Sequence, residues 1–163
     1  MNAFLKAASL GAAALAIPLT VASVARTDAQ PALGLAQKDS KKPHRVVIQV
    51  SDNDPKLMNL ALNNAENLRR FYEDTGGGVE IEIVAYGPGL NMLRSDSSPV
   101  KERLAALGGH MKGLTISGCG NTMETQSRQE NKQISLVPEA RVVATGIARI
   151  VELQEQGWAY IRP

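Results

Sequence analysis

The sequence holds one cysteine, two histidines and few aromatic residues, which make up only 4% of the chain. A single cysteine excludes an intramolecular disulfide framework and a cysteine-based zinc ribbon. Because two separated histidines and one cysteine give no metal-ligand spacing, we expect no metal and no other cofactor. The charge is nearly balanced, with 18 Lys+Arg against 16 Asp+Glu and a formal net charge of +2. The chain therefore lacks the basic field that nucleic-acid binding requires, and we expect no nucleic-acid partner.

What the sequence does contain is the composition of one folded domain. Its 163 residues suit a single domain, and its 21% of charged residues is close to the value for globular proteins. With 44% hydrophobic residues and few aromatic rings, the core is expected to be aliphatic and rich in alanine.

Residues 1–29 have the layout of a secretory signal peptide. Lys6 supplies a basic start, residues 7–25 are almost wholly apolar, and Ala25 or Ala29 follows small residues at a plausible cleavage site. An uncleaved membrane anchor is the alternative, because the apolar run is nearly long enough to span a bilayer. The weak hydrophobicity of this alanine-rich run favours cleavage, so we expect a protein exported to the periplasm.

Residues 30–43 are polar, hold two prolines and show no periodicity, so we expect a flexible tether after the leader. The folded domain is expected to cover residues 44–163. No later stretch of the sequence is long and apolar enough to span a bilayer, so we expect no membrane contact once the leader is removed.

Along the domain, short segments that are β-branched or alternate apolar and polar residues are each followed by an amphipathic segment. Four β–α units and a final strand predict an α/β fold, a three-layer α/β/α sandwich with a mainly parallel five-stranded sheet. Asp54 is expected to cap the first long helix, with Pro55 at its first position. Asn121 and Glu124 are expected to form a capping box at the start of a later helix. The expected strands cover 46–50, 79–85, 112–117, 140–144 and 158–161, and the expected helices 55–75, 90–93, 100–107, 123–133 and 146–156.

The sequence also predicts where two groups of charged residues lie in the fold. Glu80 and Glu82 alternate with apolar residues on the second strand, whereas a central parallel strand is usually apolar on both faces. We therefore expect this strand near a sheet edge or beside a basic partner, with a solvated carboxylate face. Arg94, Lys101 and Arg103 are expected to form a solvated helix face.

Cys119 is the main candidate for chemistry. In open parallel sheets ligands bind at the carboxyl ends of the strands, and Cys119 follows a strand directly and precedes an expected helix. Glycines on both sides are expected to leave the sulfur open. The free amides and positive dipole of a helix start favour the thiolate, which is the reactive form of cysteine. The alternative is a small buried apolar residue at a strand end, which is the usual state of a free cysteine.

Support for other chemistry is weak. A Cys–His pair would depend on His110, which lies in a glycine-rich turn and is more typical of a loop residue than of a base. Residues 87–89 and 118–120 are glycine-rich and suit an anion, but neither matches a P-loop or a dinucleotide fingerprint.

Four segments together resemble the DsrE/DsrF-like family, in particular its exported single-domain members. They are LALNNAENL (Leu60–Leu68), AYGPGLNML (Ala85–Leu93), CGNTM (Cys119–Met123) and QEQGWAYIRP (Gln154–Pro163). The resemblance covers essentially all of residues 45–163. It implies a sandwich of flavodoxin-like appearance, assembly into homotrimers or homohexamers, and a strand-end cysteine that accepts and passes on sulfane sulfur as a persulfide.

The leading hypothesis is therefore an exported sulfur-handling protein, at most a sulfurtransferase-like carrier. Its partners would be sulfur donor and acceptor proteins or small thiols. Cys119 is expected to be the nucleophile and carrier. Two alternatives are a small-anion or nucleotide binding module without catalysis, and an oligomeric scaffold with a buried thiol. The residues expected to line the substrate site are Gly120, Asn121, Thr122, Tyr86 and Asn91.

Overall fold

The computed structural model describes residues 42–163. The predicted signal peptide and nearly all of the predicted tether lie outside the described residues. The first strand begins at His44, where the sequence places the start of the domain.

Five parallel strands form one sheet in the order β4-β3-β2-β1-β5. Each β–α unit returns the chain to the same end of the sheet, so every strand points the same way. The carboxyl ends of all five strands therefore lie along one edge. The strands are β1 (His44–Val50), β2 (Val79–Ala85), β3 (Leu114–Cys119), β4 (Ala140–Val143) and β5 (Ala159–Ile161).

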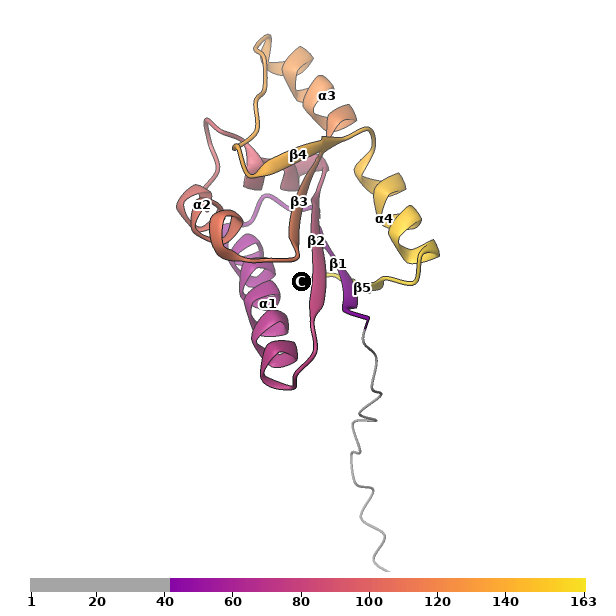
Figure 1. The fold of residues 1–163 in the computed structure, drawn as a ribbon. Helices are drawn as coiled ribbons and strands as arrows, with labels where there is room; N and C mark the ends of the chain where they lie inside the picture. Colours follow the sequence, from indigo (N-terminus) through magenta and orange to yellow (C-terminus); the bar gives the residue numbers. More distant parts are fainter. Residues whose placement is uncertain (1–41) are drawn as a thin grey trace, which may run out of the picture. The chain divides into compact units, whose positions relative to one another are not determined.

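Helices cover both faces of the sheet, which confirms the predicted three-layer α/β/α sandwich. Figure 1 shows α1 and α2 on one side of the strands and α4 on the other. Within residues 42–163, no helix combines the length and the apolar character needed to cross a bilayer. The helices are α1 (Pro55–Asp74), the 3-10 helix η1 (Gly87–Leu93), α2 (Lys101–His110), α3 (Gly120–Glu130) and α4 (Gly146–Glu155).

The start of α1 follows the predicted capping chemistry. The Asp54 side chain accepts a hydrogen bond from the Lys56 amide at 2.8 Å, and Pro55 is the first helical residue. Because proline has no amide hydrogen, the helix loses no bond at this position.

The apolar core is divided unequally between the two faces. On the α1 side, Met58 and Leu62 of the helix pack on Ile48, Ile81 and other buried strand residues. On the α4 side, four fully or nearly fully buried residues form a small cluster, which leaves room on that face for polar side chains. They are Val47, Val84, Ile150 and Leu153.

Strand β2 lies in the middle of the sheet, so its predicted position near an edge is wrong. Glu80 is exposed, as predicted, but Glu82 is only 1% exposed, so a solvated face is wrong for that residue. The predicted basic partner is confirmed, since Arg149 and Arg141 both pair with the Glu82 carboxylate. These ion pairs allow a charged residue on a central strand.

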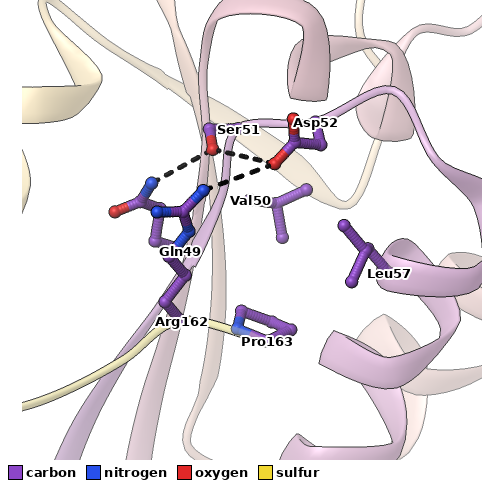
Figure 2. Close-up of a pocket in the computed structure, with 7 residues that line it drawn as sticks. All are labelled: Gln49, Val50, Ser51, Asp52, Leu57, Arg162 and Pro163. Carbon is purple, nitrogen blue, oxygen red and sulfur yellow. Dashed lines mark hydrogen bonds and ion pairs between the residues drawn. The ribbon is translucent and has the colours of Figure 1, made fainter.

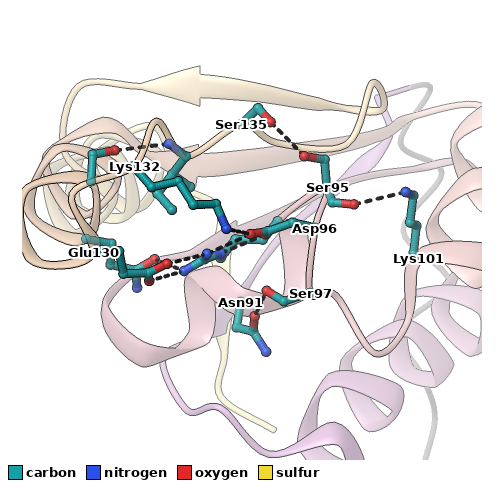
Figure 3. Close-up of polar contacts among 12 residues, drawn as sticks. Asn91, Ser95, Asp96, Ser97, Lys101, Glu130, Lys132 and Ser135 are labelled. Atoms are coloured by element: carbon teal, nitrogen blue, oxygen red, sulfur yellow. Dashed lines mark hydrogen bonds and ion pairs between the residues drawn. The ribbon is translucent and has the colours of Figure 1, made fainter.

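The predicted solvated position of Arg94 is also wrong, because its side chain is buried in a network of charged residues. Its guanidinium donates to both oxygens of Asp96, at 3.0 and 2.9 Å, and to Glu130. Figure 3 shows Lys132 reaching Asp96 from the α3 side. Arg94 and then Lys132 hold the pKa of the Asp96 carboxyl well below its ordinary value.

Helix α3 is attached to the rest of the domain mainly by polar contacts, and none of its residues is buried. The Thr122 hydroxyl accepts from the Gly87 amide at 3.0 Å, and the Gln126 side chain lies 3.4 Å from the Gly87 carbonyl. At the other end of the helix, Arg94 donates to Gln126 and Glu130. These side-chain contacts fix a helix that packing alone leaves exposed.

Candidate functional site

Cys119 is the last residue of β3, and its side chain lies on the α4 face of the sheet. Ser117, two residues earlier and so on the same face, contacts the Glu82 cluster beneath α4. Val143 of β4 is the strand partner of Cys119. On the other side, Tyr86 directly follows the residue paired with Gly118, which places it beside Cys119. A row of side chains from neighbouring strands thus meets at the carboxyl end of the sheet.

Cys119 is also the N-cap of α3, so the predicted cap at Asn121 is wrong. The helix begins at Gly120, and the Cys119 sulfur accepts a hydrogen bond from the Thr122 amide at 3.4 Å. This is the bond that a serine or aspartate oxygen makes at an ordinary N-cap. The Asn121 amide donates to the Ala144 carbonyl at 3.1 Å, which ties the start of α3 to the end of β4.

The first residue of α4 packs against the same sulfur. A Cβ atom on Gly146 would lie 2.9 Å from Cβ of Tyr86 and 3.2 Å from Cβ of Cys119, so only glycine allows this approach. The Gly146 amide also lowers the pKa of the Cys119 thiol. The thiol therefore lies between the N-termini of two helices, α3 and α4, whose dipoles both favour negative charge.

The Thr122 side chain connects the η1 loop with the thiol. Its hydroxyl oxygen accepts a hydrogen bond from the Gly87 amide at 3.0 Å. The same hydroxyl lowers the pKa of the Cys119 thiol.

These contacts oppose the effect of burial on the pKa of Cys119. Burial is the largest single influence and raises the pKa of the thiol. The hydrogen bonds from the Thr122 hydroxyl and from the amides of Gly146, Thr122 and Asn121 together outweigh it and hold the pKa below its ordinary value. The site thus favours a thiolate.

The predicted open position of the sulfur is wrong. Cys119 is 4% exposed, because Gly146 and Tyr86 pack over it. The surroundings of the sulfur are nonetheless rich in hydrogen-bond donors, which distinguishes it from a thiol buried among hydrocarbon groups.

The other predicted site residues divide into two groups. Tyr86 and Thr122 lie against Cys119, and Asn121 takes part through its backbone amide alone. Asn91 lies elsewhere, since its side chain donates to Asn53 at 2.8 Å and accepts from Ser97. Gly120 is turned toward β4, where a Cβ atom would meet Val142, Val143 and Ala144.

His110 is not a partner of the thiol. It ends α2, before β3 begins, and its ring contacts the Ala106 carbonyl at 3.0 Å. Cys119 is at the far end of β3, about 16 Å from the first residue of that strand at roughly 3.3 Å per residue. Among residues 42–163, no group of three or more His, Cys, Asp or Glu side chains is arranged to hold a metal.

A cluster of charged residues that the sequence does not reveal lies around Glu82, on the same face of the sheet as the thiol. The Glu82 carboxylate accepts from Arg149 at 2.9 and 2.8 Å, from Arg141 at 3.0 Å and from Ser117 at 2.7 Å. Burial raises the pKa of Glu82, but the bonds from Arg149, Ser117 and Arg141 bring it below its ordinary value. Arg141 and Arg149 also line a groove of about 390 Å³ between β4 and α4.

A second hollow, at the end of β1, is too small for a substrate. Figure 2 shows Gln49, Ser51, Asp52 and Arg162 around it. Its volume is about 10 Å³, which is close to the minimum for one water molecule.

The fold and the site define an α/β protein whose parallel sheet has helices on both faces. A hydrogen-bonded thiol lies at the carboxyl edge of this sheet. No family model matches the chain, and no curated protein matches it. Among solved structures, it is similar to the protein of unknown function MTH1491 from Methanobacterium thermoautotrophicum, with 34% sequence identity and a TM-score of 0.63. The match covers 74% of this chain and 99% of that one. The chain therefore belongs to the same family as MTH1491.

Proposed function

We propose that this chain is an exported sulfur carrier of the kind that the DsrE/DsrF resemblance implies. Cys119 accepts one sulfane sulfur atom as a persulfide and passes it to an acceptor thiol. One observation carries the proposal: the Cys119 sulfur caps α3, accepting from the Thr122 amide at 3.4 Å, and Cys119 also lies against Gly146, the first residue of α4. The Thr122 hydroxyl and the amides at these two helix starts lower the pKa of this buried thiol. The thiolate is the attacking species in exchange reactions between sulfur atoms.

The transfer needs no cofactor. The Cys119 thiolate attacks the outer sulfur of a donor R–S–SH, a new S–S bond forms, and the S–S bond of the donor breaks. The donor leaves as R–S⁻ and takes a proton from solvent. In the second step an acceptor thiolate attacks the outer sulfur on Cys119, and the Cys119 thiolate is the leaving group. The hydrogen-bonding groups around the sulfur stabilise the Cys119 thiolate and so make it a better leaving group in this step.

The expected setting of this reaction follows from the leader and the resemblance. The predicted signal peptide supports a periplasmic location, with sulfur donor and acceptor proteins or small thiols as partners. The resemblance supports assembly into homotrimers or homohexamers. The mass of the mature chain from a periplasmic extract tests export, and light scattering of the purified protein tests assembly.

The direct test is sulfur loading. Purified protein is incubated with a sulfane donor, and intact mass spectrometry should detect one added sulfur atom on the wild type and none on Cys119→Ser. No addition to the wild type, or the same addition to the serine variant, contradicts the proposal.

A scaffold without sulfur chemistry is the second candidate, because Cys119 is only 4% exposed. A buried structural thiol would react slowly with both an alkylating reagent and a sulfane donor. A carrier should react slowly with a bulky alkylating reagent and readily with a small donor. Comparing the two rates on the native protein separates these functions.

A further inference from the structure

The groove between β4 and α4 has the size of an organic ligand site. Its volume is about 390 Å³, within the range of roughly 300–1,000 Å³ for small-molecule pockets. Val143, the strand partner of Cys119, lines it, and so does Thr145, which precedes the Gly146 amide donor. The groove therefore adjoins the segments that enclose the sulfur.

Arg141 supplies the groove with an available hydrogen-bond donor. Its Nε bonds to Ser117 at 3.1 Å and its Nη2 to Glu82 at 3.0 Å, which hold the guanidinium in place. Its Nη1 has no hydrogen-bond partner among the described residues, and the side chain is 51% exposed. A fixed guanidinium with a free N–H is well suited to bind a carboxylate.

The charge balance of the groove also favours an anion at this point. Arg149 pairs with two carboxylates, those of Glu82 and Glu152, whereas Arg141 pairs only with Glu82, which it shares with Arg149. The less neutralised positive charge of the groove is therefore that of Arg141. Glu152 pairs with Arg149 at 3.3 Å, but it is 57% exposed at the rim, where solvent weakens its effect. The Thr145 hydroxyl makes no hydrogen bond to the first turn of α4 and is a further available donor.

The spacing of Arg141 and Cys119 limits the length of the ligand. Arg141 pairs with Ser117, and Cys119 lies two residues further along β3 on the same face. With about 3.3 Å per residue along a strand and about 4.8 Å between strands, the two Cα atoms are about 8 Å apart. A ligand bound through a carboxylate at Arg141 must carry its reacting sulfur several bonds away.

We propose that this groove is the donor site of the carrier and that it binds a small carboxylate-bearing thiol persulfide. The carboxylate binds Arg141, and the terminal sulfur is directed to Cys119. This assignment rests on the proposed function, because it names the donor for the same thiol. The step is Cys119–S⁻ + R–S–SH → Cys119–S–SH + R–S⁻. One S–S bond forms as another breaks, and no oxidant or reductant is consumed.

The test compares two persulfides that differ in charge. Loading of Cys119 is followed by intact mass spectrometry with glutathione persulfide, which carries carboxylates, and with N-acetylcysteamine persulfide, which carries none. Arg141→Gln should raise the half-saturating concentration of glutathione persulfide roughly tenfold, the loss expected for one hydrogen bond to a charged group. The same variant should affect loading from the uncharged donor much less, so the ratio of the two half-saturating concentrations should change roughly tenfold. Arg69→Gln, on α1 at the opposite face, is the matched control and should change neither reaction.

A second variant covers the case in which Arg141→Gln fails to fold. Glu152→Gln removes an exposed negative charge from the rim and should lower the half-saturating concentration of glutathione persulfide about twofold, with no effect on the uncharged donor. Equal use of both donors, or an equal effect of a variant on both, overturns the donor site and leaves the carrier function intact. Failure of both donors to load the wild type overturns the carrier function itself.

Discussion

A methyl group on Gly146 would lie 3.2 Å from Cβ of Cys119, and the amide of this glycine lowers the pKa of the Cys119 thiol. The first turn of α4 can therefore reach the thiol only because residue 146 has no side chain. This contact makes the position sensitive to the smallest possible substitution.

Gly146→Ala should destabilise the protein by about 1–3 kcal/mol, the usual cost of overpacking, and should slow sulfur loading. The new methyl group would lie 2.9 Å from Cβ of Tyr86, so α4 must shift and withdraw its amide from the sulfur. Gly109→Ala in α2 is the control, since a Cβ there meets nothing within 4 Å. It should leave stability unchanged or raise it by up to about 1 kcal/mol. Urea unfolding of both variants checks this, and equal stabilities would contradict it.

Thr122→Val should raise the pKa of Cys119, because it removes the hydroxyl donor and keeps the shape and the backbone amide. The ultraviolet absorbance of the thiolate, followed against pH, measures this pKa. Thr125→Val is the matched control, since that hydroxyl bonds to the Asn121 carbonyl at 2.9 Å and not to the sulfur.

The same pair of threonine variants should differ in the pH dependence of stability. A folded-state pKa below the unfolded value stabilises the protein at pH values above the unfolded pKa, and this contribution is lost as the pH falls through the folded pKa. Thr122→Val should therefore reduce the gain in stability between these two pKa values. A Thr125→Val protein with the same reduced gain would show that the effect is not specific to the sulfur.

Glu82→Gln should destabilise the protein by about 1–3 kcal/mol, because it removes the buried carboxylate that the half-buried Arg149 and the exposed Arg141 share. Glu80→Gln, on the same strand but exposed, should change stability by no more than about 0.5 kcal/mol. Denaturant unfolding at neutral pH measures both.

The fall of stability in acid gives a second measure of how much the ionised Glu82 carboxylate stabilises the protein. Its folded-state pKa is lowered, so its contribution is present above the unfolded pKa and disappears as the pH falls through the folded pKa. The stability of Glu82→Gln should therefore decline less steeply in acid than that of the wild type. An unchanged acid profile would mean that Glu82 is not ionised in the folded protein.

Arg94→Ala should destabilise the protein, since it removes a buried side chain together with its bonds to Asp96 and Glu130. Arg69→Ala, which breaks an exposed ion pair with Glu73 within one helix, should cost about 0.5 kcal/mol or less. Thermal unfolding at low and high salt compares them, and similar losses would show that the Arg94 network adds little.

The sequence predicts the sheet, the helices and the position of Cys119 because these depend on local patterns. The β-branched residues of β1 and the Asp54 cap of α1 lie within a few residues of what they determine. The strand-end position of Cys119 follows from the same periodicity. The parallel order of strands then brings Tyr86 beside Cys119 without any further signal.

Local sequence patterns do not predict the polar clusters around Glu82 and Arg94. Glu82 is separated from Arg141 by 59 residues and from Arg149 by 67, and only the folded sheet brings them together. The alternation of β2 indicates either a place near a sheet edge or a basic partner for its carboxylates, and the partner itself has no sequence signal. The predicted cap of α3 is wrong because Asn is a far more common N-cap than Cys, and the Cys119 sulfur takes this role two residues before Asn121.

Helix α3 is held by hydrogen bonds and ion pairs and buries no residue, so its detachment would expose little apolar surface. Such an opening would leave almost no trace in the heat capacity or in the denaturant dependence of unfolding, which both follow exposed area. It would nevertheless carry the Asn121 and Thr122 amides away from the sulfur. Hydrogen exchange at these two amides, measured together with the reactivity of the thiol, would detect this opening, whereas calorimetry would not.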